Sequence, residues 1–112
     1  MSAITTHVLD TSRGYPAAEM HVVLYQECKE GWKALGEGRT DVNGRCNTLM
    51  GDGLPGAGTY RLIFHTAAYF EAQSVETFYP EVPVIFEVRD PNAHYHVPLL
   101  ISPFGYSTYR GS

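Results

Sequence analysis

The sequence predicts an all-β sandwich or barrel with one short helix. Short segments rich in valine, threonine and aromatic residues recur along the chain between turn-forming residues, which is the pattern of antiparallel strands joined by tight turns. With 112 residues, the chain is long enough to close one hydrophobic core but too short for two independent ones. We therefore expect residues 1–112 to form a single domain.

About eight strands are expected, with turn signals between several of them. The segments are 4–10, 20–27, 32–40, 45–48, 58–65, 82–87, 94–102 and 104–110. The first strand ends before Arg13-Gly14-Tyr15-Pro16, and the fourth begins after Asn43-Gly44, a pair that favours a tight reversal with positive φ. Leu54-Pro55-Gly56 and Asp90-Pro91-Asn92 mark the turns before the fifth and seventh strands.

Residues 66–73 depart from the strand pattern. This segment contains good helix formers and neither proline nor glycine, and Thr66 at its start is able to cap a helix. One short helix is therefore expected between the fifth and sixth strands.

Composition and charge argue against several kinds of partner. The chain has 8 Lys and Arg against 12 Asp and Glu, so it has no basic surplus for phosphate groups, and nucleic acid is not an expected partner. No apolar run reaches the roughly 18–20 residues of a membrane helix, and residues 1–7 lack the features of a secretory signal. We expect no membrane association and a cytoplasmic location, in which Cys28 and Cys46 stay reduced.

A His-x-His motif in the seventh expected strand is the first candidate for chemistry. Because alternate side chains of a strand point to opposite faces, His94 and His96 share one face with Pro98 and Leu100. The two imidazoles are therefore expected to point the same way.

Three interpretations of this motif remain open from the residues alone. The histidines can be structural, partly buried rings with hydrogen bonds. They can supply two zinc ligands, with His7, His21 or His65 as a third. They can also perform metal-free acid–base catalysis, in which a histidine takes a proton from water while a nearby cation stabilises the developing negative charge. Arg45 and Arg110, at strand ends, are the candidate cations.

Further motifs occur in order along the whole chain. They are His7-Val8-Leu9-Asp10 followed by Gly14 and Pro16, Thr40-Asp41 with Gly44-Arg45, Phe78-Tyr79-Pro80-Glu81-Val82, His94-Tyr95-His96-Val97-Pro98-Leu99-Leu100, and Tyr109-Arg110-Gly111-Ser112. With these motifs the chain resembles, from end to end, the 5-hydroxyisourate hydrolases, the transthyretin-related enzyme family. The Tyr-Arg-Gly-Ser segment is the most specific motif, because the hormone carrier transthyretin lacks it and lacks the set of active-site histidines.

The resemblance implies a fold, an assembly and an activity. The fold is the transthyretin-like, or prealbumin-like, sandwich of two four-stranded antiparallel sheets with one short helix. The assembly is a homotetramer, a dimer of dimers with pockets in a channel between the dimers. The activity is hydrolysis of 5-hydroxyisourate to 2-oxo-4-hydroxy-4-carboxy-5-ureidoimidazoline in urate degradation, with neither a metal nor another cofactor.

The same resemblance assigns the site residues. His7, Arg45 and His96 are expected to be catalytic, with His7 or His96 as the general base and Arg45 offsetting charge on the carbonyl oxygen. The expected substrate-binding residues are His7, Arg45, Tyr109, Arg110 and Ser112.

Two other classes of function remain open. A transthyretin-like carrier would bind a small hormone-type molecule without chemistry, since a fold does not fix a function. A zinc-dependent cyclic amide hydrolase would use the histidines as metal ligands. The set of His7, Arg45 and His96 favours metal-free hydrolysis, because a carrier does not require it and a guanidinium repels a neighbouring divalent cation.

Overall fold

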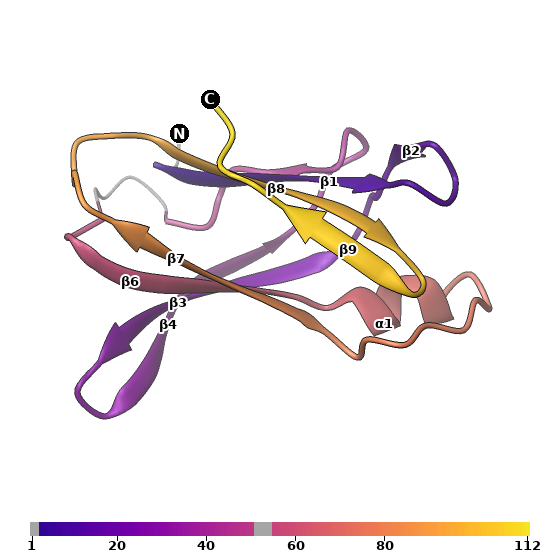
Figure 1. Cartoon of the computed structure of the whole chain (residues 1–112), viewed down its shortest axis with the longest axis horizontal. Coiled ribbons are helices and arrows are strands. Elements are labelled where there is room, and N and C mark those ends of the chain that lie inside the picture. The colour runs from indigo at the N-terminus through magenta and orange to yellow at the C-terminus, as the bar shows by residue number, and fades with distance from the viewer. Residues whose placement is uncertain (1–2, 51–54) are drawn as a thin grey trace.

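The computed structural model describes residues 3–50 and 55–112 and contains two β-sheets packed face to face (Figure 1). This described part of the chain forms nine strands and one helix. The elements are β1 Ile4–Asp10, β2 Tyr15–Pro16, β3 His21–Cys28, β4 Gly31–Arg39, β5 Arg45–Cys46, β6 Gly58–Phe64, α1 Thr66–Glu71, β7 Val82–Val88, β8 Tyr95–Ser102 and β9 Gly105–Thr108. The all-β sandwich with one short helix is confirmed. The turn expected at 54–56 begins at Leu54, which lies outside the described residues.

The two sheets differ in how closely they follow the expectation of two four-stranded antiparallel sheets. The second sheet has the order β4-β3-β6-β7 and is antiparallel throughout. The first has the order β2-β1-β8-β9, and β5 also pairs with β1, so it contains five strands. In this sheet β1 and β8 are parallel, from Ile4 opposite Tyr95 to Asp10 opposite Ile101.

The parallel pair corrects the prediction, and its cause is the connection between the two strands. No hairpin joins β1 to β8, because the chain builds the whole second sheet between them. A tight turn makes two strands that follow each other in sequence antiparallel. It does not determine the relative direction of strands as far apart in sequence as β1 and β8.

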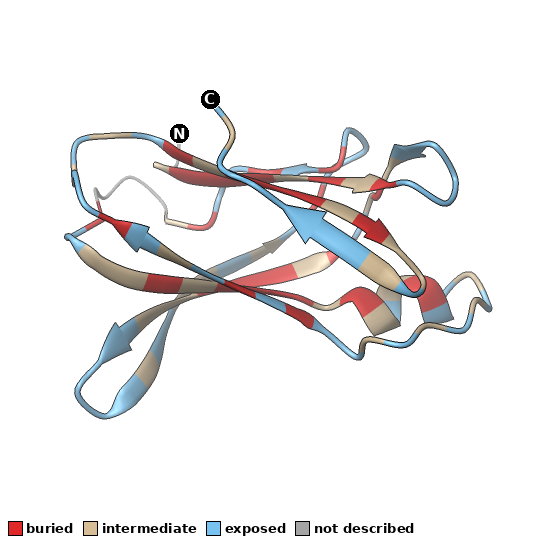
Figure 2. Ribbon diagram, in the orientation of Figure 1, coloured by how far each residue is buried: buried red, intermediate tan, exposed pale blue. Residues whose placement is uncertain are grey.

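Strand alternation places the core between the sheets. Buried positions alternate with more exposed ones along several strands (Figure 2). Among the residues that face inward, each exposed by 6% or less, are Ile4, Val8, Leu24, Leu62, Phe64, Val97 and Leu99. Each such side chain contributes roughly 1.5–3 kcal/mol through burial. The other face of the first sheet points away from this core.

The helix is shorter than expected and begins differently. α1 ends at Glu71 instead of residue 73, and its N-cap residue is His65, which makes no side-chain capping bond. Thr66 does not cap the helix because it is already the first helical residue, and its buried hydroxyl donates to the carbonyl of Tyr79 at 3.4 Å. No helix of the described residues is long and apolar enough to cross a membrane.

The expected strand 45–48 is reduced to the two residues of β5. After Cys46 the chain leaves β1 and runs against β4 of the other sheet. There a Cβ placed on Gly38 would lie 2.8 Å from the Thr48 hydroxyl. A Cβ placed on Gly36 would lie 2.0 Å from the Leu49 carbonyl oxygen. The backbone approaches β4 closely because these two positions carry no side chain.

Candidate active site

The outer face of the first sheet gathers several of the expected site residues. Ile4 and Val8 of β1 face the core, so Thr5 and His7 point outward. The parallel register places Thr5 opposite His96, and the β1–β5 register places His7 opposite Arg45. Three strands therefore bring an imidazole, a hydroxyl and a guanidinium to one face.

A tight turn positions Arg45. The Asp41 carboxylate accepts hydrogen bonds from the backbone N–H groups of Asn43 and Arg45, at 2.8 and 3.0 Å. Gly44 has φ +76°, as expected for the Asn-Gly turn, and its carbonyl accepts a 2.7 Å hydrogen bond from the Val8 N–H. Within the described residues the Arg45 guanidinium has no carboxylate partner, so its donors are available to a ligand.

A pocket of about 240 Å³ lies on this face. Its lining residues are Thr5, Thr6, Arg45, Asn47, His94, His96 and Ser112. The rings of His94 and His96 stand nearly parallel, with centroids 6.5 Å apart and planes 14° apart, so the two imidazoles do share one face. His7 does not line this pocket and lies beside it, across from Arg45.

The pKa of His96 is lowered from its ordinary value of 6.5. Burial of the ring is the largest cause, because it disfavours the charged form, and the positive charge of Arg45 is the next. His7 and His94 lower the pKa further. His96 is therefore a neutral imidazole near pH 7, which is the form that accepts a proton.

The residues of the Tyr109–Ser112 segment line two different pockets. The N–H of Gly111 donates to the carbonyl of His96 at 2.8 Å, which carries Ser112 into the histidine pocket. The guanidinium of Arg110 lies 4.7 Å from the ring centre of Tyr95, and Tyr109 is 58% exposed. These two residues line an adjoining pocket of about 320 Å³ between β7 and β8, which His96 also lines.

Gly111 passes so close to His96 that a side chain would not fit. A Cβ at this position would lie 2.5 Å from Cδ2 of His96 and 3.2 Å from Cγ of Pro98. The last strand therefore ends at Thr108, earlier than the expected residue 110, because the chain turns to cross the imidazole.

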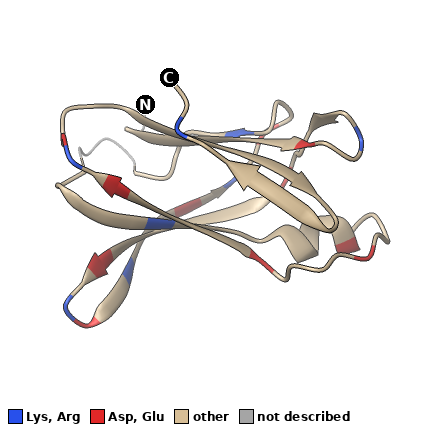
Figure 3. Ribbon diagram, viewed as in Figure 1, with Lys and Arg blue, Asp and Glu red and all other residues tan. Residues whose placement is uncertain are grey.

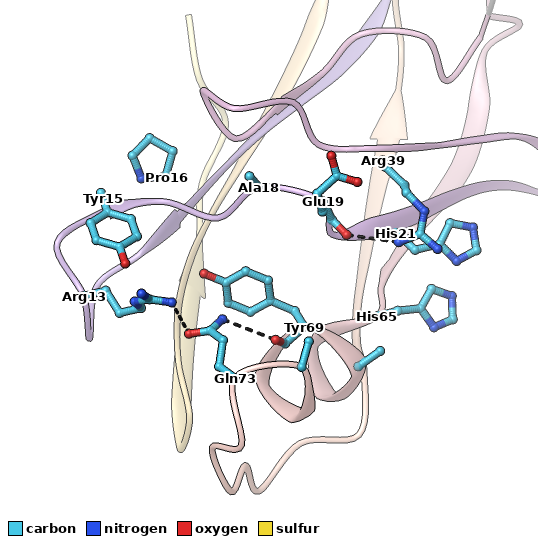
Figure 4. Close-up of a pocket in the computed structure, with 12 residues that line it drawn as sticks. Arg13, Tyr15, Pro16, Ala18, Glu19, His21, Arg39, His65, Tyr69 and Gln73 are labelled. Carbon is cyan, nitrogen blue, oxygen red and sulfur yellow. Dashed lines mark hydrogen bonds between the residues drawn. The ribbon is translucent and has the colours of Figure 1, made fainter.

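A larger cavity lies elsewhere, and none of the expected catalytic or substrate-binding residues lines it. It has a volume of about 510 Å³ and lies between α1 and the turn that follows β1 (Figure 4). His21 and His65 stack there with ring centres 4.8 Å apart, and His21 hydrogen-bonds Glu37 at 2.7 Å. These two histidines lie apart from His94 and His96, and no group of three metal-binding side chains is found among the described residues.

Basic residues are spread over several elements of the described chain instead of forming one patch (Figure 3). Arg13 faces Gln73, Arg89 pairs with Glu87 at 2.7 Å, and Arg61 lies over the rings of Tyr25 and Trp32. Arg45 differs from these side chains because it lies in the pocket next to the imidazoles.

The sequence patterns do not single out Thr5 or Asn47 as site residues, and they indicate His94 only as part of the His-x-His motif. Alternation alone could have placed Thr5 on the face of His7, two residues away. Its position opposite His96 depends on the parallel register, which local sequence does not encode.

Together, the fold and the pocket define a class of protein: a small β-sandwich with imidazole and guanidinium groups on the outer face of one sheet. The chain belongs to the HIUase/Transthyretin family, whose model matches residues 4–111.

Similar proteins include 5-hydroxyisourate hydrolases and a transthyretin. A 5-hydroxyisourate hydrolase of Salmonella typhimurium is 48% identical, over 97% of this chain and 80% of that protein. The structure of Klebsiella pneumoniae 5-hydroxyisourate hydrolase matches with a TM-score of 0.87 and 38% identity over 100% of both chains. Sea bream transthyretin in complex with thyroxine matches with a TM-score of 0.90 and 31% identity, over 97% of this chain and 94% of that one. The overall fold alone therefore does not distinguish the named hydrolases from the thyroxine-bound transthyretin.

Proposed function

We propose that this protein hydrolyses 5-hydroxyisourate to 2-oxo-4-hydroxy-4-carboxy-5-ureidoimidazoline in urate degradation, with residues 1–112 acting as one hydrolase domain. The observation that carries the proposal is the pocket in which neutral His96, Arg45 and Ser112 meet. The similarity to proteins named 5-hydroxyisourate hydrolase supports the same reaction.

In this proposal His96 is the general base. It takes a proton from water as the water oxygen bonds to the carbonyl carbon of the ring amide. Arg45 donates hydrogen bonds to the carbonyl oxygen, on which negative charge develops. When the ring C–N bond breaks, the proton passes from His96 to the leaving nitrogen, and the new carboxylic acid releases the second proton of the water to solvent to become a carboxylate.

The remaining expected residues are assigned to substrate binding. His7 lies across from Arg45 and is proposed to orient the substrate and to tune the charge near His96. Ser112 lines the pocket, and its hydroxyl is proposed to hydrogen-bond the polar substrate. Tyr109 and Arg110 are proposed to act from the adjoining pocket between β7 and β8.

We further propose that the chain assembles as a homotetramer, a dimer of dimers, and acts in the cytoplasm. β7 and β9 are edge strands of their sheets and leave unpaired backbone groups, which commonly pair across subunits. In that assembly Tyr109 and Arg110 would contact substrate together with a neighbouring copy. The two cysteines are free thiols, with Cys28 exposed, as suits a reducing compartment.

The test is to generate 5-hydroxyisourate from urate in situ and to follow the decay of its ultraviolet absorbance with and without the protein. Because the substrate also decays unaided, the expected result is a rate above that background that rises in proportion to protein concentration. Binding of substrate without acceleration would favour the carrier. Loss of turnover in chelator-treated protein, restored by zinc, would favour the metal-dependent hydrolase.

The acid limb of the pH profile is expected to lie below pH 6.5, because the pKa of His96 is lowered from that value. The neutral base persists as the pH falls and is lost only when the pH passes through this lowered pKa. Arg45→Gln removes a positive charge and should move the acid limb to higher pH. Arg45→Lys keeps the charge and should leave the limb in place while lowering kcat/KM, because an ammonium does not reproduce a planar fork of donors.

The measurement for both variants is kcat/KM from about pH 5 to about pH 9, corrected for unaided decay. An acid limb that is the same in Arg45→Gln and the parent protein would remove Arg45 from the environment of the base. Unchanged kcat/KM in Arg45→Lys would remove the bidentate role.

A further inference from the structure

Thr5 is a buried hydroxyl that contacts both histidines of the His-x-His motif. Its Oγ1 lies 2.8 Å from Nδ1 of His96 and 3.2 Å from Nε2 of His94. The residue is only 8% exposed, so water competes little for these hydrogen bonds. The three side chains therefore form one continuous hydrogen-bonded row along the wall of the pocket.

A hydroxyl carries one hydrogen, so Thr5 donates to one ring and accepts from the other when both rings are neutral. In one arrangement Nδ1–H of His96 donates to Thr5, and Thr5 donates to Nε2 of His94. In the other arrangement both hydrogen bonds run in the opposite direction, and the proton of His96 is on Nε2. Only the first arrangement leaves Nε2 of His96 unprotonated and able to take a proton from water.

The surroundings of His96 favour the first arrangement. Arg45 lines the same pocket, and a nearby cation stabilises a nitrogen lone pair over an N–H group that faces it. Among the described residues no group accepts a hydrogen bond from Nε2 of His96, so nothing in that part of the chain holds a proton there. His94 is exposed, and water can therefore satisfy whichever nitrogen Thr5 does not use.

We infer that Thr5 is a positioning residue, whose hydroxyl holds His96 in the Nδ1–H tautomer, with Nε2 as the base, and links it to His94. This inference rests on the proposed hydrolysis. When Nε2 takes the proton of the attacking water, the hydrogen bond from Nδ1–H to Thr5 becomes charge-assisted and stabilises the imidazolium. The proton at Nε2 then moves to the leaving ring nitrogen, so the three side chains return to their starting state.

The kinetic test compares two substitutions at this position. Thr5→Val keeps the β-branched shape and removes the hydroxyl, and it is expected to lower kcat by roughly tenfold to a hundredfold while KM changes by less than about threefold. Thr5→Ser keeps the hydroxyl and is expected to retain kcat within about threefold of the parent. Equal kcat values for Thr5→Val and the parent protein would overturn the inference.

A matched control separates this effect from the general cost of losing a threonine hydroxyl. Thr11 follows β1 and donates to the carbonyl of Ile101 at 3.1 Å, at the far end of the same pair of strands and outside the histidine pocket. Thr11→Val should leave kcat unchanged. If kcat fell in Thr11→Val as much as in Thr5→Val, the loss of any threonine hydroxyl between β1 and β8 would have this effect. That result would overturn the specific role of Thr5.

The tautomer can be read without substrate from the ¹⁵N chemical shifts of the imidazole nitrogens, with the His96 signals assigned by their loss in His96→Asn. The parent protein is expected to show Nδ1 protonated and Nε2 unprotonated near neutral pH, and Thr5→Val a shift towards the other tautomer. A protonated Nε2 in the parent would overturn the inference. Failure of the proposed function looks different, because the parent would then give no acceleration of 5-hydroxyisourate decay whatever its tautomer.

Discussion

Replacing His96 with asparagine is expected to lower kcat by roughly 10²- to 10⁴-fold, the usual loss when a general base is removed. Asparagine retains a hydrogen-bonding group near the position of Nδ1, so the contact with Thr5 can persist while the group that takes the proton is gone. The loss should therefore fall on turnover instead of on folding. Single-turnover and steady-state decay of 5-hydroxyisourate, together with the circular dichroism spectrum, check this result.

His65→Asn is the matched control for His96. His65 is a histidine of the same chain that stacks on His21 in the other cavity and has no side-chain hydrogen bond among the described residues. Its substitution should leave kcat within about twofold of the parent. Near-normal kcat in His96→Asn, or an equal loss in both variants, would rule out His96 as the base.

Removing residues 109–112 is expected to lower kcat/KM by roughly 10²-fold or more, because the segment brings Ser112 into the pocket and holds the backbone of His96. The cost in stability should be small. Tyr109 and Arg110 are exposed, and the truncation removes one backbone hydrogen bond to His96 and one cation–π interaction with Tyr95, together worth about 1–2 kcal/mol. Thermal melts and kcat/KM of the truncated protein separate the two effects. Ordinary rates after truncation would count against a role for the segment in catalysis.

A substitution that adds a single methyl group tests the same segment without removing it. Gly111→Ala places a Cβ against Cδ2 of His96, so either the segment or the imidazole must shift, and kcat/KM should fall. Gly105→Ala is the control in the same β8–β9 hairpin, because its nearest neighbour, Oγ of Ser102, would lie at an ordinary 3.7 Å. Equal kcat/KM values for the two alanine variants would show that the close approach of Gly111 to His96 does not affect activity.

The layers of the fold could be predicted from sequence because their cause is local. Alternating apolar residues define which face of each strand is buried, and Asn43-Gly44 specifies a reversal that the structure forms with Gly44 at positive φ. The parallel pairing of β1 with β8 could not be predicted in this way. It depends on how the whole second sheet is inserted between the two strands, and no short segment carries that information.

The candidate site could likewise be predicted only where its cause is local in sequence. The shared face of His94 and His96 follows from strand periodicity and needs no tertiary information. From the residues alone Arg45 is only one of two candidate cations for the histidines, because it lies on a different strand from His96, and the family resemblance is what selects it. The separation of Ser112 from Tyr109 and Arg110 had no signal in the sequence, because it results from the path of the backbone over His96.

The pairing of β1 with β8 also bears on when the protein can become active. Thr5 is separated in sequence from its hydrogen-bond partners His94 and His96 by 89 and 91 positions. Most of the chain must therefore be ordered before the pocket exists. Contacts of such high sequence separation form slowly. During synthesis the edge of β1 that pairs with β8 has no lasting partner until β8 leaves the ribosome, and an unpaired strand edge is prone to aggregate or to bind chaperones. A nascent chain that stops before β8 therefore contains His7 and Arg45 but not the assembled pocket of the candidate site.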